Sequence, residues 1–196
     1  MRIISGKYKG RSISVPREVR FRPTTGKAKE ALFSTLESLV AIEGLRVADF
    51  YAGSGAFGFE ALSRGALFTL FVENNGNLAD SIKKNARQLQ LVSDEYLVIK
   101  SSFERGSEII KQKPISVTFD VIFCDPPYEM HPGDELIKRI LSAGLVHSGS
   151  IIIIESSTDL VMGAKFSISK VEARLIKKKS YGQTILRYYE CLLSPD

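Results

Sequence analysis

The stretch Val47-Ala-Asp-Phe-Tyr-Ala-Gly-Ser-Gly-Ala-Phe-Gly-Phe-Glu-Ala-Leu-Ser-Arg-Gly65 decides the fold. It contains a short apolar segment that ends in Asp49, a glycine-rich turn over residues 52–55, and a helical pattern that stops at Arg64 and Gly65. A basic last turn followed by glycine is typical of a helix C-terminus. A strand, a tight turn and a helix in this order form the first unit of an open α/β sheet, in which ligands bind outside the carboxyl ends of the strands. Glycines in the turn let backbone N–H groups approach a ligand closely.

The same turn has two possible ligands. Residues 53–58 match the Gly-x-Gly-x-x-Gly pattern of dinucleotide-binding proteins, and Glu73 stands where that pattern expects an acid that binds a ribose. Asp49 argues against a dinucleotide, because its carboxylate would repel a diphosphate. S-adenosylmethionine carries an ammonium group, a positive sulfur and an adenosine but no phosphate. The turn therefore fits S-adenosylmethionine better.

The rest of the chain predicts strands and helices in alternation. Apolar segments of strand length occupy residues 69–73, 96–100, 119–124 and 151–155. Amphipathic helical patterns follow Thr25 and Asn77, which we expect to be the N-cap residues, and a third covers residues 133–143. Two longer strands, 166–179 and 184–193, are joined around a turn that contains Gly182. We therefore expect an α/β fold with a Rossmann-like sheet that is mostly parallel and has an antiparallel last strand.

Length and composition restrict the class of protein. The 196 residues are enough for one domain with a hydrophobic core and too few for two nucleotide-binding folds. No apolar run reaches the roughly 18 residues of a membrane-spanning helix, and the N-terminus lacks the pattern of a secretion signal. We therefore expect a cytoplasmic protein. Cys124 and Cys191, with only two histidines in the chain, indicate buried free thiols and no metal site.

Positive charge is concentrated near the N-terminus. Residues 1–29 contain nine Lys or Arg and one acid, Glu18, and carry a net charge of +8, whereas the rest of the chain carries −3. An alternating pattern over residues 1–15 predicts a hairpin with a basic loop. A basic segment on a mildly acidic body indicates a polyanionic partner, although a solvated basic surface is the alternative. We divide the chain into a basic N-terminal extension, 1–24, and a main domain, 25–196.

The segment Asp125-Pro126-Pro127-Tyr128 directly follows the fourth predicted strand. Prolines do not pair in a sheet, and two of them hold the segment in an extended, rigid conformation. Tyr128 can stack on a flat base. The Asp125 carboxylate and the Pro126 carbonyl can accept the two N–H groups of an exocyclic amine. This orientation would aim the amine lone pair at a methyl donor; a plain strand-ending turn is the alternative.

This segment resembles the (Asn/Asp)-Pro-Pro-(Tyr/Phe) motif of amino-methyltransferases that act on nucleic-acid bases. The wider pattern combines Arg-Ile-Ile at 2–4, Lys-Gly-Arg at 9–11, Arg-Pro-Thr-Thr at 22–25, Lys-Glu-Ala-Leu-Phe at 29–33 and the stretch 47–65. Nearly the whole chain is thereby similar to the bacterial family of small-subunit ribosomal RNA guanine-N2 methyltransferases. The resemblance implies a class I methyltransferase fold and methyl transfer from S-adenosylmethionine to the N2 amine of one guanine.

The resemblance and the charge pattern assign expected roles to individual residues. The residues expected to bind the guanine are Asp125, Pro126, Pro127 and Tyr128. Those expected to bind the cofactor are Asp49, Tyr51, Ala52, Gly53, Ser54, Gly55, Glu73, Asn74, Ser102 and Phe103. Those expected to contact RNA are Arg2, Lys7, Lys9, Arg11, Arg22, Thr24, Thr25 and Lys27. The family often has an acid or an amide where this chain has Ser102, and an arginine where it has Lys29.

The expected partner is ribosomal RNA or the assembling small ribosomal subunit. We expect the protein to be a monomer that binds neither a metal nor a membrane. Other functions stay open. Asp-Pro-Pro-Tyr alone does not exclude methylation of another base, such as adenine N6 in DNA, although such enzymes usually have an additional target-recognition region. A nicotinamide-dependent oxidoreductase would leave Asp-Pro-Pro-Tyr without a role. A non-catalytic RNA-binding module would leave the acidic strand ends without one.

Overall fold

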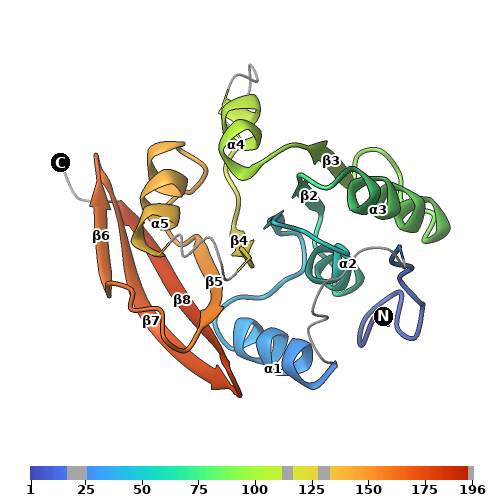
Figure 1. The fold of residues 1–196 in the computed structure, drawn as a ribbon, viewed down its shortest axis with the longest axis horizontal. Coiled ribbons are helices and arrows are strands. Elements are labelled where there is room, and N and C mark those ends of the chain that lie inside the picture. The colour runs from blue at the N-terminus through green and yellow to red at the C-terminus, as the bar shows by residue number, and fades with distance from the viewer. Residues whose placement is uncertain (17–25, 112–116, 128–132, 194–196) are drawn as a thin grey trace. The chain divides into compact units, whose positions relative to one another are not determined.

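The computed structural model describes residues 1–16, 26–111, 117–127 and 133–193. The chain forms two compact units, Met1–Phe103 and Glu104–Asp196. Each unit combines strands with helices (Figure 1), as in the α/β fold that the sequence predicts. In the ranges that the structure describes, every helix is too short or too polar to cross a membrane.

The first unit contains a parallel sheet with strand order β3-β2-β1. Its elements are α1 (Gly26–Glu37), β1 (Arg46–Phe50), α2 (Ala56–Ser63), β2 (Phe68–Glu73), α3 (Gly76–Gln88) and β3 (Tyr96–Lys100). All but the first residue of β1 and of β2 are buried, as expected of parallel strands that are covered on both faces. α2 packs on β1 and β2, and α3 packs on β2 and β3. The carboxyl ends of these strands therefore carry the glycine-rich turn and Glu73.

α3 begins two residues earlier than the sequence pattern indicates. Asn75, not Asn77, is the N-cap residue, because its side-chain oxygen accepts hydrogen bonds from the N–H groups of Asn77 at 3.0 Å and Leu78 at 3.3 Å. Asn75 has an extended backbone, whereas the helix starts at Gly76. The prediction of Asn77 as the cap was wrong by two residues.

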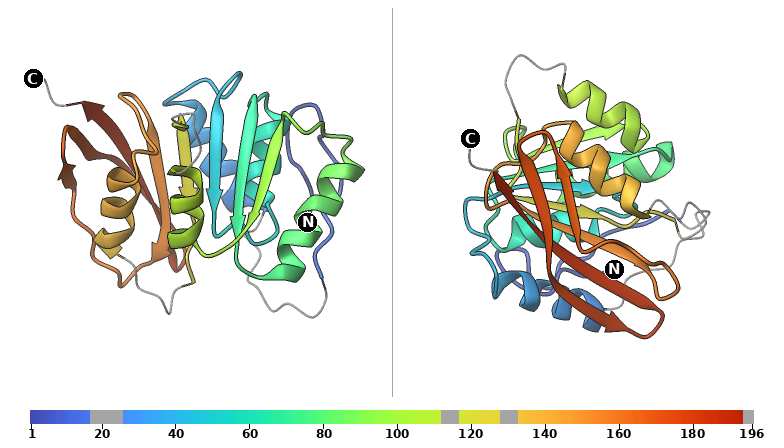
Figure 2. Two further views of the ribbon diagram at one scale, coloured as in Figure 1. Left: turned by 90° about the horizontal axis from the view of Figure 1, so that it is seen from above. Right: turned by 90° about the vertical axis from the view of Figure 1, so that its left-hand side faces the viewer.

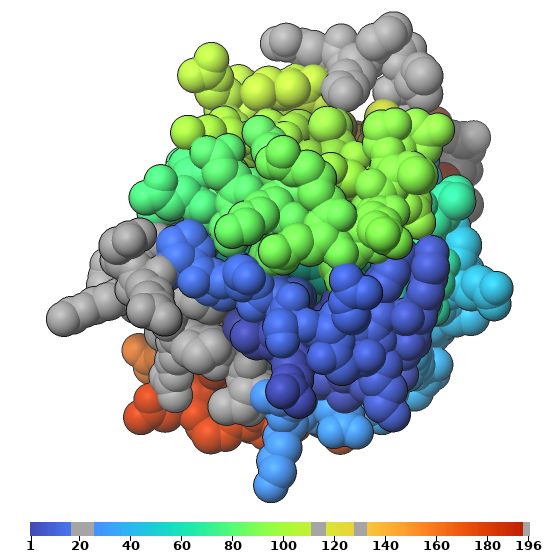
Figure 3. All heavy atoms as spheres, turned by 90° about the vertical axis from the view of Figure 1, so that its right-hand side faces the viewer, coloured from blue at the N-terminus to red at the C-terminus, as the bar shows by residue number. Residues whose placement is uncertain are grey.

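The N-terminal segment, residues 1–15, packs into the first unit. One β-bridge joins Arg2 and Ser12 within the described residues, so the expected hairpin is short. Ile3, Tyr8 and Ile13 are buried in the same hydrophobic cluster as side chains of α2, β2 and α3. Figure 3 shows this segment, in blue, lying along the green surface of the α3 region. The predicted domain boundary after residue 24 lies outside the described residues.

The second unit changes from parallel to antiparallel pairing along its sheet. Its elements are α4 (Phe103–Lys111, which starts at the last residue of the first unit), β4 (Val121–Cys124), α5 (Gly133–Ser142), β5 (Ile151–Ser157), β6 (Lys165–Ile168), β7 (Val171–Tyr181) and β8 (Thr184–Leu193). β4 and β5 are parallel, and β5-β8-β7-β6 continue antiparallel. α5 packs against β6 and β7 (Figure 2).

The predicted fold is confirmed, with one correction near the C-terminus. The expected strand 166–179 is two strands, because the chain turns at Ser169, which has a φ of 54°, and Lys170. The antiparallel part of the sheet therefore contains β6, β7 and β8 rather than one last strand. Cys124 and Cys191 are buried and are not joined in a disulfide, as expected.

Candidate functional site

The glycine-rich turn after β1 contains one glycine that is packed closely against side chains and one that has space around its Cα. Gly53 and Gly55 have φ values of 55° and 74°, in the left-handed region that favours glycine. A Cβ on Gly55 would lie 2.9 Å from the ring of Phe59 and 3.1 Å from that of Phe71. A Cβ on Gly53 would have only the Tyr51 carbonyl oxygen near it, at 3.8 Å. Gly55 thus allows α2 to start against β2, and Gly53 leaves the turn accessible to a ligand.

Glu73 at the end of β2 fixes the shape of this turn. Its Oε2 accepts a hydrogen bond from the N–H of Gly53 at 2.7 Å, and its Oε1 accepts one from the N–H of Asn75 at 2.7 Å. The side chain is buried, whereas the neighbouring Asn74 is exposed. Each carboxylate oxygen keeps a second lone pair for a ligand hydroxyl. Glu73 can therefore shape the turn and bind a ribose at once.

Asp49 at the end of β1 is turned toward the start of α2. It is buried, and its Oδ2 accepts a hydrogen bond from the N–H of Gly58 at 3.0 Å. A carboxylate at the first turn of a helix is favoured by the helix dipole. A Cβ on Gly58 would lie 2.3 Å from the Phe71 ring. Asp49 on β1 and Gly58 on α2 therefore hold α2 close to the sheet. This contact fixes the position of the turn that joins β1 to α2.

Aromatic rings line the backbone beside the turn. Tyr51 has a φ of 58°, an uncommon value for a residue with a side chain, and stacks on Phe103 with ring centroids 5.9 Å apart. Phe103 is buried and contacts the Phe50 ring edge-to-face at 4.9 Å. Two serines precede Phe103. Among the described residues, the buried Oγ of Ser101 has no hydrogen-bond partner, and Ser102 is exposed. Ala52 and Ser54 of the turn are buried.

Asp125 follows β4 in the second unit. Cys124 pairs with Ile154 of β5, so Asp125 lies at the level of Glu155 on the neighbouring strand. Burial raises the pKa of Asp125 from 3.8 to about 6. Pro126 is buried and Pro127 is exposed, while Tyr128 lies outside the described residues. Asp125 is thus a carboxylate that is charged at neutral pH in surroundings that disfavour its charge.

The expected RNA-contacting cations are mostly at the surface. Those that are exposed are Arg2, Lys7, Lys9, Arg11 and Lys27, whereas Arg22, Thr24 and Thr25 lie outside the described residues. A hydrogen bond with Tyr8 raises the pKa of Lys7, whose Nζ lies 5.0 Å from the Tyr8 ring centroid. Arg11 donates a hydrogen bond to the Gln88 carbonyl at 2.7 Å. Lys29 contributes to the N-terminal charge excess but is buried.

Comparison with known proteins identifies the family. The family model described as "Conserved hypothetical protein 95" matches residues 1–190. The chain belongs to this family. One relative, the ribosomal RNA small subunit methyltransferase D of Haemophilus influenzae, is 32% identical to this chain over 97% of this chain and 93% of its own length. The putative rRNA methyltransferase YlbH of Bacillus subtilis is 30% identical over 97% and 98%.

The fold of this family member is also similar to solved structures. The putative methyltransferase yhhF from Escherichia coli superposes with a TM-score of 0.81 at 28% identity, over 99% of both chains. The methyltransferase family and the Rossmann-like fold that the sequence resemblance implied are therefore confirmed. In the described part of this family member, no group of three His, Cys, Asp or Glu is placed to bind a metal ion.

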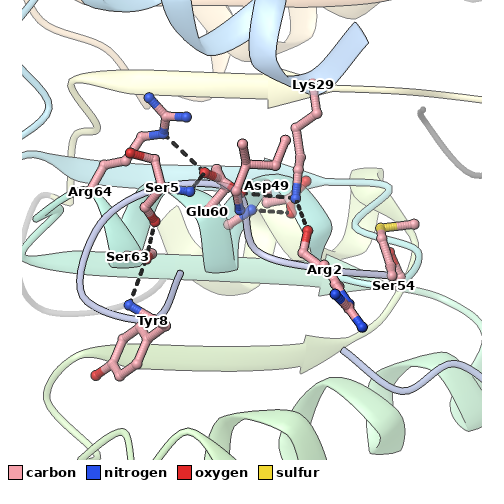
Figure 4. A network of polar contacts seen from close by, with 12 residues as sticks. Arg2, Ser5, Tyr8, Lys29, Asp49, Ser54, Glu60, Ser63 and Arg64 are labelled. Carbon is pink, nitrogen blue, oxygen red and sulfur yellow. Dashed lines mark hydrogen bonds and ion pairs between the residues drawn. The ribbon is translucent and has the colours of Figure 1, made fainter. Parts of the chain in front are cut away.

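Sequence reasoning missed the role of Glu60 on α2. The carboxylate is completely buried and lies 2.9 Å from Lys29 Nζ and 3.1 Å from Arg64 Nε. It also accepts hydrogen bonds from the N–H groups of Ile4 at 2.9 Å and Ser5 at 3.0 Å (Figure 4). Glu60 thereby anchors the N-terminal segment to α2. An acid in the middle of the apolar sequence 56–62 was the available signal.

A second missed acid is Glu155 in β5. It follows the apolar run Ile151–Ile154, as Glu73 follows an apolar run in β2. Its side chain is buried, and it lies opposite the position of Asp125 on the neighbouring strand. The sequence pattern offered the same signal for Glu155 as for Glu73, namely a carboxylate at the carboxyl end of a buried strand.

Proposed function

We propose that this protein transfers a methyl group from S-adenosylmethionine to the exocyclic N2 amine of a guanine in small-subunit ribosomal RNA. The family membership supports methyl transfer, and the names of the relatives support ribosomal RNA as the substrate. The observation that carries the proposal is Asp125, a half-buried carboxylate at the start of Asp-Pro-Pro-Tyr whose pKa is raised by desolvation. Groups with perturbed pKa values are concentrated at functional sites.

Residues of the first unit support a site for S-adenosylmethionine. Gly53 leaves the turn after β1 open, and Glu73 at its rim has free lone pairs for the ribose hydroxyls. The unpartnered hydroxyl of buried Ser101 provides a donor and an acceptor next to Ser102 and Phe103. The cofactor supplies an electrophilic methyl group on a positively charged sulfur. The carboxylates at this end favour that positive charge over a phosphate-bearing ligand.

In the second unit, Asp125 acts on the amine of the base. Its carboxylate and the Pro126 carbonyl accept the two N–H groups, which orients the nitrogen lone pair toward the methyl group. When the N–C bond forms, the methyl–sulfur bond breaks and the amine must lose one proton. A carboxylate whose pKa is about 6 accepts that proton more readily than one with the ordinary value of 3.8. Asp125 therefore both orients the amine and receives its proton.

The exposed cations of the N-terminal segment contact RNA phosphates in this proposal. Arg2, Lys7 and Lys9 of that segment are exposed, and so is Lys27 of α1. Phosphate contacts position an RNA without reading its sequence. The target guanine must leave its stack before its amine can reach Asp125, and phosphate contacts on either side stabilise the opened strand.

The test is the identity of the methylated nucleotide. Small-subunit ribosomal RNA is incubated with the protein and S-adenosylmethionine carrying a labelled methyl group, digested to nucleosides and analysed by mass spectrometry. We expect N2-methylguanosine with the parent protein and none with Asp125→Ala, which should still bind the cofactor in calorimetry. N6-methyladenosine, formed preferentially on DNA, would favour the alternative amino-methyltransferase. No methylated nucleoside on any nucleic acid would overturn the proposal.

A further inference from the structure

The β7–β8 hairpin of the second unit carries cations that the mechanism above does not use. Lys177, Lys178 and Lys179, here called the lysine cluster, are consecutive on β7 and lie shortly before Tyr181, the last residue of that strand. From Leu175 to Leu186 the hairpin contains these three cations and no acid. Lys178 and Lys179 are exposed, and the Tyr181 ring is partly exposed. The end of the hairpin is thus a positively charged surface with an aromatic side chain.

The charge of this surface is not neutralised by the acid nearest to it on β7. Glu172 is already paired with Lys165, at 2.7 Å, and with Arg174. As far as the described residues extend, Lys178 and Lys179 have no carboxylate within ion-pair distance. The cluster also lies beyond the end of β6, which pairs only with residues 171–174 of β7. Figure 1 shows β7 and β8 continuing past β6.

A β-bulge determines which way the lysines face. Leu175 is opposite Tyr189 and Lys177 is opposite Tyr188, so Ile176 is an extra residue in β7. Without the bulge, Lys177 and Lys179 would share a sheet face with Arg187, a buried cation bound to Ser156 and the Leu160 carbonyl. The bulge moves these two lysines to the opposite face and leaves only Lys178 opposite Arg187. Two cations are thereby aligned on one face.

The register of the sheet places this face in line with Asp125. Lys179 is opposite Leu186, and Leu186 is opposite Glu155 of β5. Asp125 lies at the level of Glu155 on the next strand. Three strand spacings of about 4.8 Å separate Lys179 from Asp125, or about 14 Å. A few nucleotides of RNA cover such a distance.

We propose that the lysine cluster and Tyr181 form a second RNA-binding surface, which contacts the phosphates of nucleotides that flank the target base. The inference rests on the proposed function, because it takes the base at Asp125 to be part of an RNA strand. Lysines in line with the base bind phosphates a few nucleotides away, and Tyr181 offers a ring on which an unstacked base can stack. The surface adds affinity and fixes the direction of the strand, while the chemistry stays at Asp125.

Lysines on an unpaired strand edge can also have a purely structural role, because they prevent pairing with the edge of another molecule. The two roles differ in what they predict. An RNA-binding surface changes the salt dependence of RNA binding when the lysines are removed. A protective edge changes self-association and leaves RNA binding as it was.

The experiment compares two variants with the same loss of charge. One is Lys177→Gln/Lys178→Gln/Lys179→Gln, and the other is Lys83→Gln/Lys84→Gln/Arg87→Gln on α3, where the cations lie on a solvated helix face. Binding of in vitro transcribed small-subunit ribosomal RNA is measured by filter binding across a salt series. Each lost contact with a phosphate of single-stranded RNA lowers the slope of log affinity against log salt by about 0.7. For two contacts, we expect the β7 variant to lose about 1.4 units of slope and to bind about 25-fold more weakly at 0.1 M salt.

The α3 variant should keep the parent slope, and all three proteins should bind S-adenosylmethionine equally in calorimetry. Equal slopes for the β7 variant and the parent would overturn this inference, and light scattering that detected self-association of that variant would then assign the lysines to edge protection. Absence of salt-dependent RNA binding by the parent would instead refute the proposed function itself.

Discussion

The buried carboxylate of Glu60 gives the sharpest test of how the first unit is assembled. It is completely buried, and four donors surround it: Lys29 Nζ, Arg64 Nε and the N–H groups of Ile4 and Ser5. Glu60→Gln keeps the size of the side chain but removes its charge. Lys29, itself 3% exposed, then retains only the Arg2 carbonyl at 2.8 Å as a partner among these contacts. A buried charge without its counter-charge is the main expected cost.

The magnitude follows from the kind of pair that is broken. Removing one partner of a buried ion pair costs about 3–5 kcal/mol. With a urea m-value of about 2 kcal/mol/M, the unfolding midpoint should fall by about 2 M. Glu37→Gln is the matched control, because Glu37 also pairs with Arg64, at 2.8 Å, but its side chain is 44% exposed. An exposed pair contributes about 0–1 kcal/mol, so this variant should unfold near the parent midpoint.

The assay combines urea unfolding with hydrogen exchange at Ile4 and Ser5. We expect Glu60→Gln to lose protection at one of these amides at least, because the glutamine side chain has one acceptor oxygen where the carboxylate has two. Glu60→Gln/Lys29→Met should be less destabilised than the sum of the single variants, since it removes the uncompensated cation as well. If the midpoint of Glu60→Gln moved by less than about 0.5 M and both amides stayed protected, Glu60 would not anchor the N-terminal segment.

Three further predictions concern the turn and the base. Glu73→Ala should weaken S-adenosylmethionine binding by about 1–3 kcal/mol in calorimetry. Glu73→Gln should weaken it less, because the amide oxygen still accepts one of the two N–H groups. If Glu73→Ala bound the cofactor as tightly as the parent, Glu73 would not belong to the site. The single-turnover rate should fall about tenfold per pH unit below pH 6, since only ionised Asp125, whose pKa is about 6, accepts the amine. In Asp125→Asn, the single-turnover rate measured in stopped-time assays should no longer fall below pH 6. If the rate of this variant fell with pH as in the parent, another group would cause the decline. Gly58→Ala should lower the free energy of unfolding by about 1–3 kcal/mol, because its Cβ would meet Phe71 at 2.3 Å. Gly26→Ala, whose Cβ meets nothing within 4 Å, should not.

The fold could be predicted from the sequence where local patterns agree with it. β3 has the predicted bounds of Tyr96–Lys100, because its apolar segment is closed by polar residues on both sides. The single predicted strand 166–179 failed, because a two-residue reversal at Ser169 and Lys170 contains neither glycine nor proline. The helix cap at Asn75 was missed for a related reason: two asparagines two residues apart are equally good caps by residue type. Backbone conformation distinguishes them, and the sequence does not specify it.

The candidate site could be located from the sequence, but its internal contacts could not. A strand-ending carboxylate is visible as a pattern at Asp49 and Glu73, whereas its hydrogen-bond partners depend on how the following turn folds back. Both acids accept backbone N–H groups of the turn or of α2. The residues were therefore found by position, and their part in shaping the turn required the structure. Glu60 had no counterpart in any strand-end pattern, because its partners come from the distant residues 4, 5 and 29.

The strand-end carboxylates differ in one physical respect that bears on function. Asp49 and Glu73 are buried against backbone N–H groups, which stabilise a negative charge. Asp125 is held in surroundings that raise its pKa to about 6, so its ionised form carries a desolvation cost at neutral pH. A protein can retain such a cost where the charge acts on a substrate, since the N–H groups of a bound amine would donate hydrogen bonds to the carboxylate. The same cost makes the carboxylate a better proton acceptor. Asp125 is therefore suited to the reacting amine, whereas the two acids of the first unit are suited to hold a cofactor in a fixed turn.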